Sequence, residues 1–336
     1  MDDLKYGTRD KRGNWTPKDP LSHAPLFAFP VRPLALLKWL PSYFLPWNLL
    51  WLVTAAIWWA YVVPHAETAK SLGGFWIAKL FVINCVAVFL FYSAFELQLY
   101  IRRSQGNRFK YNPKFPSEHK SSAFWFHSQN ADNMIRAFLS GVPIWTAWEV
   151  LGIWAWANGY GAWVTFEDHP VYLILLWLAL PVLHEAHFFV IHRLIHTPFL
   201  YKWVHSVHHN SVNPSPWSSL AMHPIEHLLY FATAGYHLLF WSHPLLAIYQ
   251  LHFAGFGAVV GHIGFDKIEV TDETAIDSHA FTHYLHHKYF EVNYGDGLIP
   301  LDKWFGCYHD GSKAGDAQMQ ARYEARKARA NAKAKA

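Results

Sequence analysis

Long stretches of this chain carry no formal charge. No Asp, Glu, Lys or Arg occurs from Trp39 to Pro64, and a second apolar run extends from Phe75 to Phe95 with Lys79 near its start. About 20 consecutive apolar residues cross a bilayer as a helix, so each run is long enough to span. Charged residues make up 15% of the chain, well below the rough quarter that soluble domains carry. We therefore expect an all-α integral membrane protein.

Further apolar stretches indicate additional crossings. One runs from Ala137 to Asn158 and is interrupted by Glu149, and another begins at Val171 and continues into a histidine-rich region. A last uncharged stretch, from His227 to Phe265, is divided by Pro244 and is expected to form either a re-entrant hairpin or another pair of spans. The sequence thus predicts about four transmembrane helices.

Basic residues are concentrated in particular loops, and this predicts an orientation. Residues 1–38 hold seven Lys/Arg and residues 102–120 hold six, whereas the turn at 159–170 holds two acidic residues and no basic one. Loops rich in Lys and Arg stay on the cytosolic side. Four crossings then place the chain after about Pro181 at the cytosolic face of a multi-pass membrane protein.

The chain reads as one helical membrane unit with polar ends. We expect a polar N-terminal arm (1–38), transmembrane helices (39–170), a histidine-rich region (171–311) and a basic, Ala-rich tail (312–336). The tail is either a solvated helix or disordered end, or a segment attracted to anionic lipid headgroups. It lacks the aromatic interleaving of nucleic-acid binders, so no nucleic-acid partner is expected. No cleaved signal peptide is visible at the N-terminus.

Histidine dominates the chemistry of the second half of the chain. Eighteen of the 23 histidines follow residue 180. Residues 192–209 contain H-x3-H and then H-x2-H-H, residues 283–287 repeat H-x2-H-H, and His223 and His227 flank Glu226. Positions i, i+3 and i+4 share one face of a helix, so the rings of each motif are expected to point in one direction.

Such a concentration of imidazoles indicates a metal site. Neutral imidazole is a good ligand for iron, zinc, copper and nickel, and burying so many polar rings without a shared partner would be costly. More than six histidine ligands suggests two metal ions. The two cysteines, Cys85 and Cys307, form no C-x2-C and imply neither a thiolate site nor a disulfide framework. H-E-A-H at 184–187 lacks the i+4 spacing of a zinc motif and is read as incidental.

These motifs resemble those of the sterol desaturase / fatty acid hydroxylase family, the membrane-bound histidine-rich di-iron oxygenases. HRLIH (192–196) is similar to the family's H-R-x-x-H, and HSVHH (205–209) to its H-x-x-H-H. HPIE (223–226) and HIG (262–264) resemble steps found in sterol-modifying members. HYLHHKYFEVNYG (283–295) resembles H-x-x-H-H followed by N-Y-G. The likeness covers residues 171–311, and the closing segment LDKWFG (301–306) departs from the family in residue order.

The resemblance implies a set of metal ligands and a set of supporting residues. The expected ligands are His192, His196, His205, His208, His209, His223, His262, His283, His286 and His287. The expected supporting residues are Arg193, Glu226, His187 and Asn293. Arg193 would pair with Asp302 or Glu226, or remain a surface charge. Glu226 would orient an imidazole through its second nitrogen, and Asn293 would turn the chain after the last ligand helix.

The resemblance also implies an activity, in which the chemistry belongs to the metal centre rather than to a catalytic side chain. It implies two iron ions per chain, O2, and electrons from NAD(P)H through a separate cytochrome b5-like or ferredoxin-like donor. The product would be a hydroxylated or desaturated membrane lipid. A sterol or related lipid is favoured, and a fatty acyl or alkyl lipid is the alternative.

Two other classes of function stay open on the residues alone. A non-catalytic metal-binding or transport protein would place its polar ligands near the bilayer midplane on broken spans. A zinc hydrolase would use fewer ligands with an acidic base beside an open metal position. Imidazole accepts both iron and zinc, so the expectation of iron comes from the resemblance. The residues leave the oligomeric state open.

Overall fold

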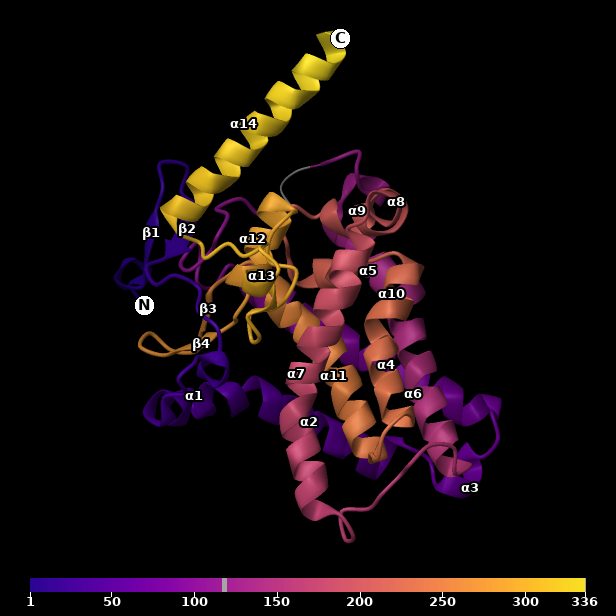
Figure 1. Cartoon of the computed structure of the whole chain (residues 1–336). Helices are drawn as coiled ribbons and strands as arrows, with labels where there is room; N and C mark the ends of the chain where they lie inside the picture. Colours follow the sequence, from indigo (N-terminus) through magenta and orange to yellow (C-terminus); the bar gives the residue numbers. More distant parts are fainter. Residues whose placement is uncertain (117–119, 336) are drawn as a thin grey trace.

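The protein is a bundle of helices, seen here in a computed structural model that describes residues 1–116 and 120–335. In Figure 1, α4, α6, α7, α10 and α11 run roughly side by side. Their bounds are Gly74–Phe95 (α4), Val142–Ala157 (α6), Pro170–Ile195 (α7), Pro224–Phe231 (α10) and Pro244–His262 (α11). Proline occupies the first turn of α6, α7, α10 and α11, where its missing N–H removes no helical hydrogen bond.

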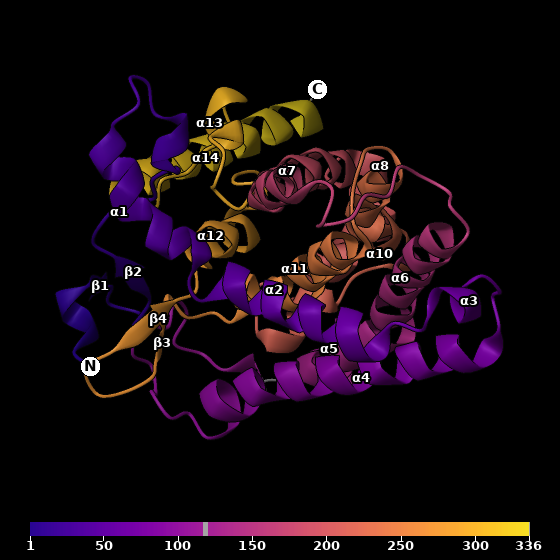
Figure 2. The ribbon, with the colours of Figure 1, turned by 90° about the horizontal axis from the view of Figure 1, so that it is seen from below.

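The N-terminal helices lie across this bundle. Helix α1 (Pro33–Phe44) and helix α2 (Trp47–Ile57), which continues as a π-helical turn η3 (Trp58–Val62), meet at a bend of 43°. Helix α2 packs across α11 (Figure 2), and the rings of Trp51 and Phe256 stack with centroids 6.1 Å apart. The pair α1–α2 therefore closes one side of the bundle beside α7 and α11.

Several helices are long and apolar enough to cross a membrane. Within the described residues these are Gly74–Ile101, Pro170–Ile195 and Pro244–His262, with the bent pair Pro33–Phe44 and Trp47–Val62 as a fourth if it counts as one span. The expected all-α membrane fold with about four candidate spans is thus confirmed. The stretch expected from Ala137 to Asn158, which forms the π-helical turn η7 (Ala137–Gly141) and the 16-residue α6, is not among them.

Helix α11 is a candidate span instead of the stretch from Ala137 to Asn158. The uncharged stretch after His227 forms the end of α10, a 3-10 segment η10 (Ala232–Leu238) and one unbroken helix, α11. Within its most apolar window, 72% of α11 is buried inside the protein. Helix α11 is therefore the central core helix of the bundle, and it delivers its C-terminal His262 to one end.

Short elements complete the chain between the long helices. They are η1 (Asp3–Lys5), β1 (Gly7–Arg9), β2 (Trp15–Pro17), η2 (Pro25–Phe27), α3 (Ala66–Ala69), η4 (Glu96–Ile101), η6 (Trp125–His127), α5 (Gln129–Arg136), α8 (Pro198–Leu200), η8 (Tyr201–His205), α9 (Ser206–His209), η9 (Pro216–Leu220), β3 (Lys267–Glu269), β4 (Ala275–Asp277), α12 (Phe281–Tyr289), α13 (Leu301–Trp304) and α14 (Lys313–Lys335). The strands form two small antiparallel pairs, β1–β2 and β3–β4. Helices α9 and α12 lie at the same end of the bundle, opposite α3 (Figure 1).

A second, smaller core fixes helix α12 from the side of the N-terminal arm. Trp15 of β2 is buried against Phe109 and Tyr111, and the ring of Tyr111 lies against that of Phe281 of α12 with centroids 5.0 Å apart. Met319 of α14 joins the same cluster. The N-terminal arm and the start of the basic tail are therefore folded parts of the structure, while the rest of α14 extends away from the bundle (Figure 1).

Candidate metal centre

Nine histidines meet in two adjoining groups at the end of the bundle where α9 and α12 lie. The first group comprises His192, His196, His205, His209 and His286. The second group comprises His208, His262, His283 and His287. Each histidine offers one ring nitrogen, and within each group these nitrogens all lie within 4.8 Å of one another. All nine are residues that the sequence singles out, and all but His196 are buried.

The two H-x2-H-H motifs are divided between the groups in a reciprocal way. From residues 205–209, the i and i+4 histidines enter the first group and the i+3 histidine, His208, enters the second. From residues 283–287, the i and i+4 histidines enter the second group and His286 enters the first. Each motif thus contributes to both groups, whereas the spacing alone led us to expect the rings of one motif to point to one place.

The ring nitrogens approach one another at distances that fit a shared metal ion. In the first group, the Nε2 atoms of His196, His209 and His286 lie 3.0–3.2 Å apart. In the second, the Nε2–Nε2 distances are 2.9 Å from His262 to His283 and 3.3 Å from His262 to His208. Imidazole nitrogens bound at about 2.1 Å to one ion lie about 3.0–3.4 Å apart in octahedral or tetrahedral geometry. The observed spacing matches that range.

The opposite ring nitrogens show which atoms are free to bind metal. The Nδ1–H of His192 donates to the carbonyl oxygen of Tyr294 at 2.7 Å, and that of His286 donates to Val292 at 2.7 Å. His262 Nδ1 donates likewise to Ala258 at 2.8 Å. A carbonyl oxygen only accepts, so Nδ1 carries the proton and Nε2 holds the lone pair. Lone pairs facing one another at about 3 Å repel unless a cation lies between them.

One histidine of the first group is held by a side chain instead. His205 Nδ1 lies 2.7 Å from Oε1 of Glu226, and its Nε2 is buried with no hydrogen-bond partner among the described residues. Burial raises the pKa of Glu226 well above its usual range and lowers the pKa of His205. Carboxylate–histidine–metal arrangements of this kind fix the ring and increase its basicity as a ligand.

Burial also keeps the imidazoles neutral. It lowers the pKa of His196 to about 2 and holds those of His208, His209, His283, His286 and His287 well below 6.5, with neighbouring histidines adding to the effect. A neutral imidazole is the form that binds metal. The chemistry of the donor set therefore fits a pair of nitrogen-bound metal ions.

The structure does not bring His223 to either group. It stands at the start of α10, where its Nδ1 accepts a hydrogen bond from the backbone N–H of Ile225 at 3.2 Å. His243 caps α11 through Leu245 in the same way. In these two His-Pro steps the ring caps the helix and proline takes the first helical position.

Two of the expected supporting residues also lie elsewhere. His187 bridges α7 to the following elements through the hydroxyl of Tyr236 at 3.0 Å and the carbonyl of Leu229 at 2.9 Å. Arg193 makes neither expected ion pair within the described part of the chain. Its guanidinium lies over the rings of Phe189 and Phe305, 5.5 and 5.1 Å from their centroids, because it follows His192 on α7 and points about 100° away from it.

Asn293 lies in the loop after α12. Its backbone adopts a positive φ of 53°, and its side chain exchanges two hydrogen bonds with the backbone of His309. This turn carries the chain back so that the carbonyl of Tyr294 reaches His192. The residue therefore supports a ligand through the path of the backbone.

Two buried carboxylates hold the loop that follows, and sequence reasoning assigned neither to this role. Glu185 of α7 accepts hydrogen bonds from the backbone N–H groups of Gly297, Leu298 and Ile299. Asp302 accepts from Tyr294 and Gly295. The available signal was the glycine-rich NYGDG sequence, whose exposed N–H groups need acceptors.

A cavity of about 550 Å³ borders the histidine groups. It lies between the N-terminal arm, α1, α2, α7, α11 and α12. Its walls include His192, His205, His208, His262 and His283, together with large apolar rings such as Trp47, Trp51, Phe188 and Phe253. The volume falls in the range of about 300–1,000 Å³ that small-molecule sites occupy.

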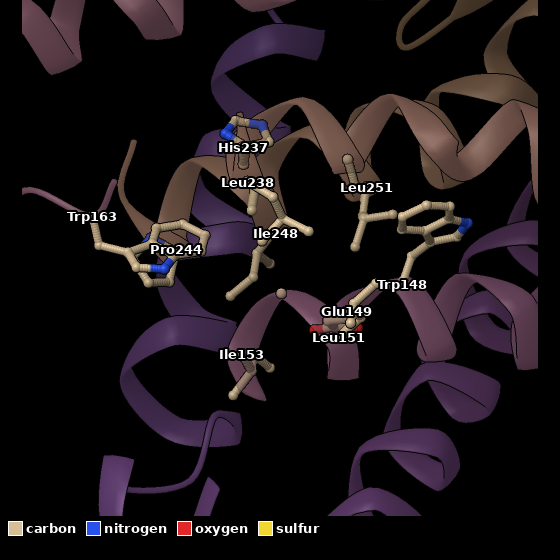
Figure 3. Close-up of a pocket in the computed structure, with 13 residues that line it drawn as sticks. Trp148, Glu149, Leu151, Ile153, Trp163, His237, Leu238, Pro244, Ile248 and Leu251 are labelled. Carbon is tan, nitrogen blue, oxygen red and sulfur yellow. The ribbon is translucent and has the colours of Figure 1, made fainter. Parts of the chain in front are cut away.

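A second cavity lies near the other end of the bundle (Figure 3). It is lined by residues of α6, η10 and α11, including Glu149 and His237. Its volume of about 10 Å³ is that of roughly one water molecule. It is too small for a lipid and contains none of the nine grouped histidines.

A helical membrane bundle that gathers nine histidines beside an apolar cavity defines a class of membrane protein built around a polyhistidine centre. The comparisons with known proteins identify it further. The model of the fatty acid hydroxylase family matches residues 177–307, a segment that contains all nine grouped histidines. The matches over this segment support the superfamily of sterol desaturases and fatty acid hydroxylases.

Fungal sterol desaturases are among the curated proteins similar to this chain. The chain is 33% identical over 144 residues to the Delta(7)-sterol 5(6)-desaturase ERG3B of Gibberella zeae, which covers 39% of this chain and 42% of that protein. It is 27% identical over 268 residues to the Delta(7)-sterol 5(6)-desaturase erg3C of Aspergillus fumigatus, covering 69% and 75%. The match spans about two fifths of the length of the first relatives. No solved structure matches the chain.

Proposed function

We propose that this protein is an O2-dependent di-iron oxidoreductase that hydroxylates or desaturates a membrane lipid, with a sterol or related lipid as the favoured substrate. The observation that carries the proposal is the pair of buried, neutral imidazole groups with Nε2 atoms 2.9–3.3 Å apart beside an apolar cavity. The family match and the sterol desaturases among the relatives support it.

The proposed ligands are the nine grouped histidines, and His223 is left out. Iron bound by them would supply reduction of O2 and cleavage of an unactivated C–H bond. The chain itself positions the rings. The carbonyls of Tyr294, Val292 and Ala258 hold the Nδ1 protons of three ligands, and Glu226 holds that of His205. Each Nε2 lone pair is thereby directed at the metal position before the metal arrives.

The cavity walls would bind the lipid and exclude water. Indole and phenyl rings from α2, α7 and α11 form much of the surface that faces the histidines. Excluding water from such a site strengthens the electrostatic interactions within it and limits side reactions. Hydroxylation consumes one O2, two electrons and two protons for each C–H bond converted to C–OH, with one water released. Desaturation consumes the same and releases two waters.

The electrons would come from NAD(P)H through a separate cytochrome b5-like or ferredoxin-like donor, and we place the centre on the cytosolic side. Basic segments lie at the histidine end of the bundle: Arg108 pairs with Glu269 just beyond α11, and the basic helix α14 starts beside α12. The acidic turn at 159–170 leads into the other end of α7. Lys/Arg-rich segments stay in the cytosol.

The test is metal content followed by turnover. Detergent-purified protein produced with iron supplied should contain about two iron ions per chain, as two separate nitrogen-rich groups require. With NAD(P)H, a reductase and a cytochrome b5-type donor, it should convert a Δ7-sterol to a product with one more oxygen or two fewer hydrogens, in an O2-dependent way. Zinc alone, with no O2 consumption on reduction, would contradict the proposal.

A fatty acyl or alkyl lipid is the second candidate substrate, because the family model is that of fatty acid hydroxylases. The same assay with a phospholipid acyl chain and an alkylglycerol distinguishes the two. If the sterol is left unchanged while an acyl chain gains oxygen, the fatty acyl lipid becomes the favoured substrate.

A further inference from the structure

Two carboxyl groups from neighbouring helices, Glu185 of α7 and Asp302 of α13, are occupied by the backbone of the loop after α12. Glu185 accepts three backbone N–H groups of this loop, and Asp302 accepts two. Asp296 lies between the two clamped glycines, Gly295 and Gly297. No hydrogen bond or ion pair to its carboxyl group occurs in the described parts of the chain. Of the three, only Asp296 has oxygen atoms available to another molecule.

The side chain of Asp296 faces the large cavity. It is a wall residue of that cavity and keeps accessible surface. The surrounding protein nevertheless desolvates it, and burial together with the nearby Asp302 raises its pKa to about 7. An exposed side chain in the wall of a cavity can be reached by a molecule that occupies the cavity.

The loop is built to keep Asp296 in this position. A Cβ atom on Gly295 would lie 2.9 Å from Oε1 of Glu185 and 3.3 Å from Oδ2 of Asp302, and Gly297 has a φ of +93°. The backbone therefore packs closely against the two clamping carboxylates. With the backbone held on both sides, Asp296 is kept at the wall of the cavity.

We infer that Asp296 accepts a hydrogen bond from a hydroxyl group of the lipid substrate and sets the end of the molecule that lies away from the metal groups. The inference rests on the proposed function and deepens it. A carboxyl group without a donor is costly in a mostly apolar space, and an alcohol supplies the missing donor whether the carboxyl is ionised or protonated.

The remaining walls fit the rest of such a molecule. Imidazoles of both groups border the same cavity, and Trp39, Trp47, Trp51 and Phe253 supply flat apolar surface between the N-terminal helices and α11. A lipid with one hydroxyl group and a bulky apolar body can place its hydroxyl at Asp296 and a C–H bond at the histidines. A lipid ending in a free carboxylate would place two acidic groups together.

The experiment measures binding in the absence of an electron donor. Iron-loaded, full-length protein in nanodiscs is titrated with a radiolabelled Δ7-sterol and with the 3-O-methyl ether of the same sterol. Asp296→Ala should weaken binding of the hydroxy-sterol by about 10-fold to 100-fold, the loss expected for a hydrogen bond to a charged group. At a pH at which the carboxyl is ionised, it should leave binding of the ether unchanged, because neither the ether nor the carboxylate has a proton to donate. Asp296→Asn keeps an acceptor oxygen and the side-chain volume and should lose less.

The matched control is Glu291→Gln, which removes a carboxylate from the same loop outside the cavity, where Glu291 pairs with Arg326. Its binding should equal that of the wild type. Equal binding of the sterol by wild type and Asp296→Ala, or an equal loss for sterol and ether, would overturn the inference. Because no turnover is involved, wild-type protein that binds the sterol but does not oxidise it would count against the proposed function alone.

Discussion

His286 and His287 are adjacent in the sequence and face different histidine groups, with ring planes 86° apart and ring centroids 6.0 Å apart. His208 and His209 show the same relationship from α9, with ring planes 78° apart. One short helix therefore carries ligands for both groups, and so does its counterpart. The two groups share their supports, although their ligand sets do not overlap.

Removing one ligand should empty one group more than the other. His208→Ala takes one of four ligands from the second group, and His286→Ala takes one of five from the first. We expect each variant to fall from about two towards about one iron ion per chain, with the larger loss in His208→Ala, and O2-dependent turnover to be lost in both. Metal analysis of the purified variants gives the count.

His223→Ala is the control for these variants. It removes a histidine of the same motif region that caps α10 and lies outside both groups. Metal content should stay at the wild-type value, while stability falls by about 1 kcal/mol for the lost cap. Full metal retention in His208→Ala, or metal loss in His223→Ala, would show that the assignment of the metal ligands is wrong.

Glu226 should affect the metal without touching it. Glu226→Ala removes the group 2.7 Å from Nδ1 of His205, and loss of such a partner lowers metal affinity by about 10-fold to 100-fold. Competition with a chelator of known affinity measures the change. Glu291→Ala, at the protein surface beside Arg326, provides the comparison. Indistinguishable chelator curves for Glu226→Ala and Glu291→Ala would argue against this support.

Gly295 should tolerate no side chain. Gly295→Ala would bring a Cβ to 2.9 Å from Glu185 Oε1, and we expect a loss of about 1–3 kcal/mol in stability, as for other overpacked buried sites. Gly152→Ala is the matched case, because a Cβ there meets nothing within 4 Å. Its position inside α6 predicts an equal or higher unfolding temperature. Thermal unfolding in detergent compares the two, and a higher midpoint for Gly295→Ala would contradict the clamp.

Acidification should destabilise the protein through its buried neutral histidines. Burial lowers the pKa of His227 to about 3, whereas the unfolded residue takes up a proton near 6.5. The unfolded state therefore binds more protons between these values. The stabilising contribution of neutral His227 is complete above pH 6.5 and is lost as the pH falls towards 3, by up to about 1.4 kcal/mol per pH unit.

The variant His227→Gln isolates this residue, because the other histidines titrate alike in both proteins. Its unfolding temperature should fall less steeply than that of the wild type between pH 6.5 and pH 5. Parallel curves would mean that His227 does not stay neutral in the folded protein. His227 contacts Ser140 and the carbonyl of Leu220 and lies outside both groups.

The sequence predicts the helical membrane fold and the nine grouped histidines, because apolar length and helical spacing are local properties. It does not predict how each H-x2-H-H motif is shared, since that depends on how α9 and α12 face one another across the bundle. His223 looks like a ligand by spacing, yet a histidine before proline also satisfies a helix N-terminus, and spacing cannot separate the two.

The supporting loop shows the same limit. Glu185 and Gly297 are separated by more than a hundred residues in the sequence, and nothing local in either segment indicates that they meet. The crossing expected at 137–158 is not among the candidate spans, whereas the largely buried α11 is. Hydropathy reports only how apolar a segment is, so it does not separate a core helix from a lipid-facing one.

Three of the proposed ligands owe their orientation to carbonyl oxygens, at positions 258, 292 and 294. Every amino acid has a carbonyl, so exchanging the side chains at these positions leaves the acceptors in place. The supports of these three ligands are therefore insensitive to side-chain substitution at the accepting residues. His205 is the exception: it relies on one side chain, and a single codon change at 226 can remove that support.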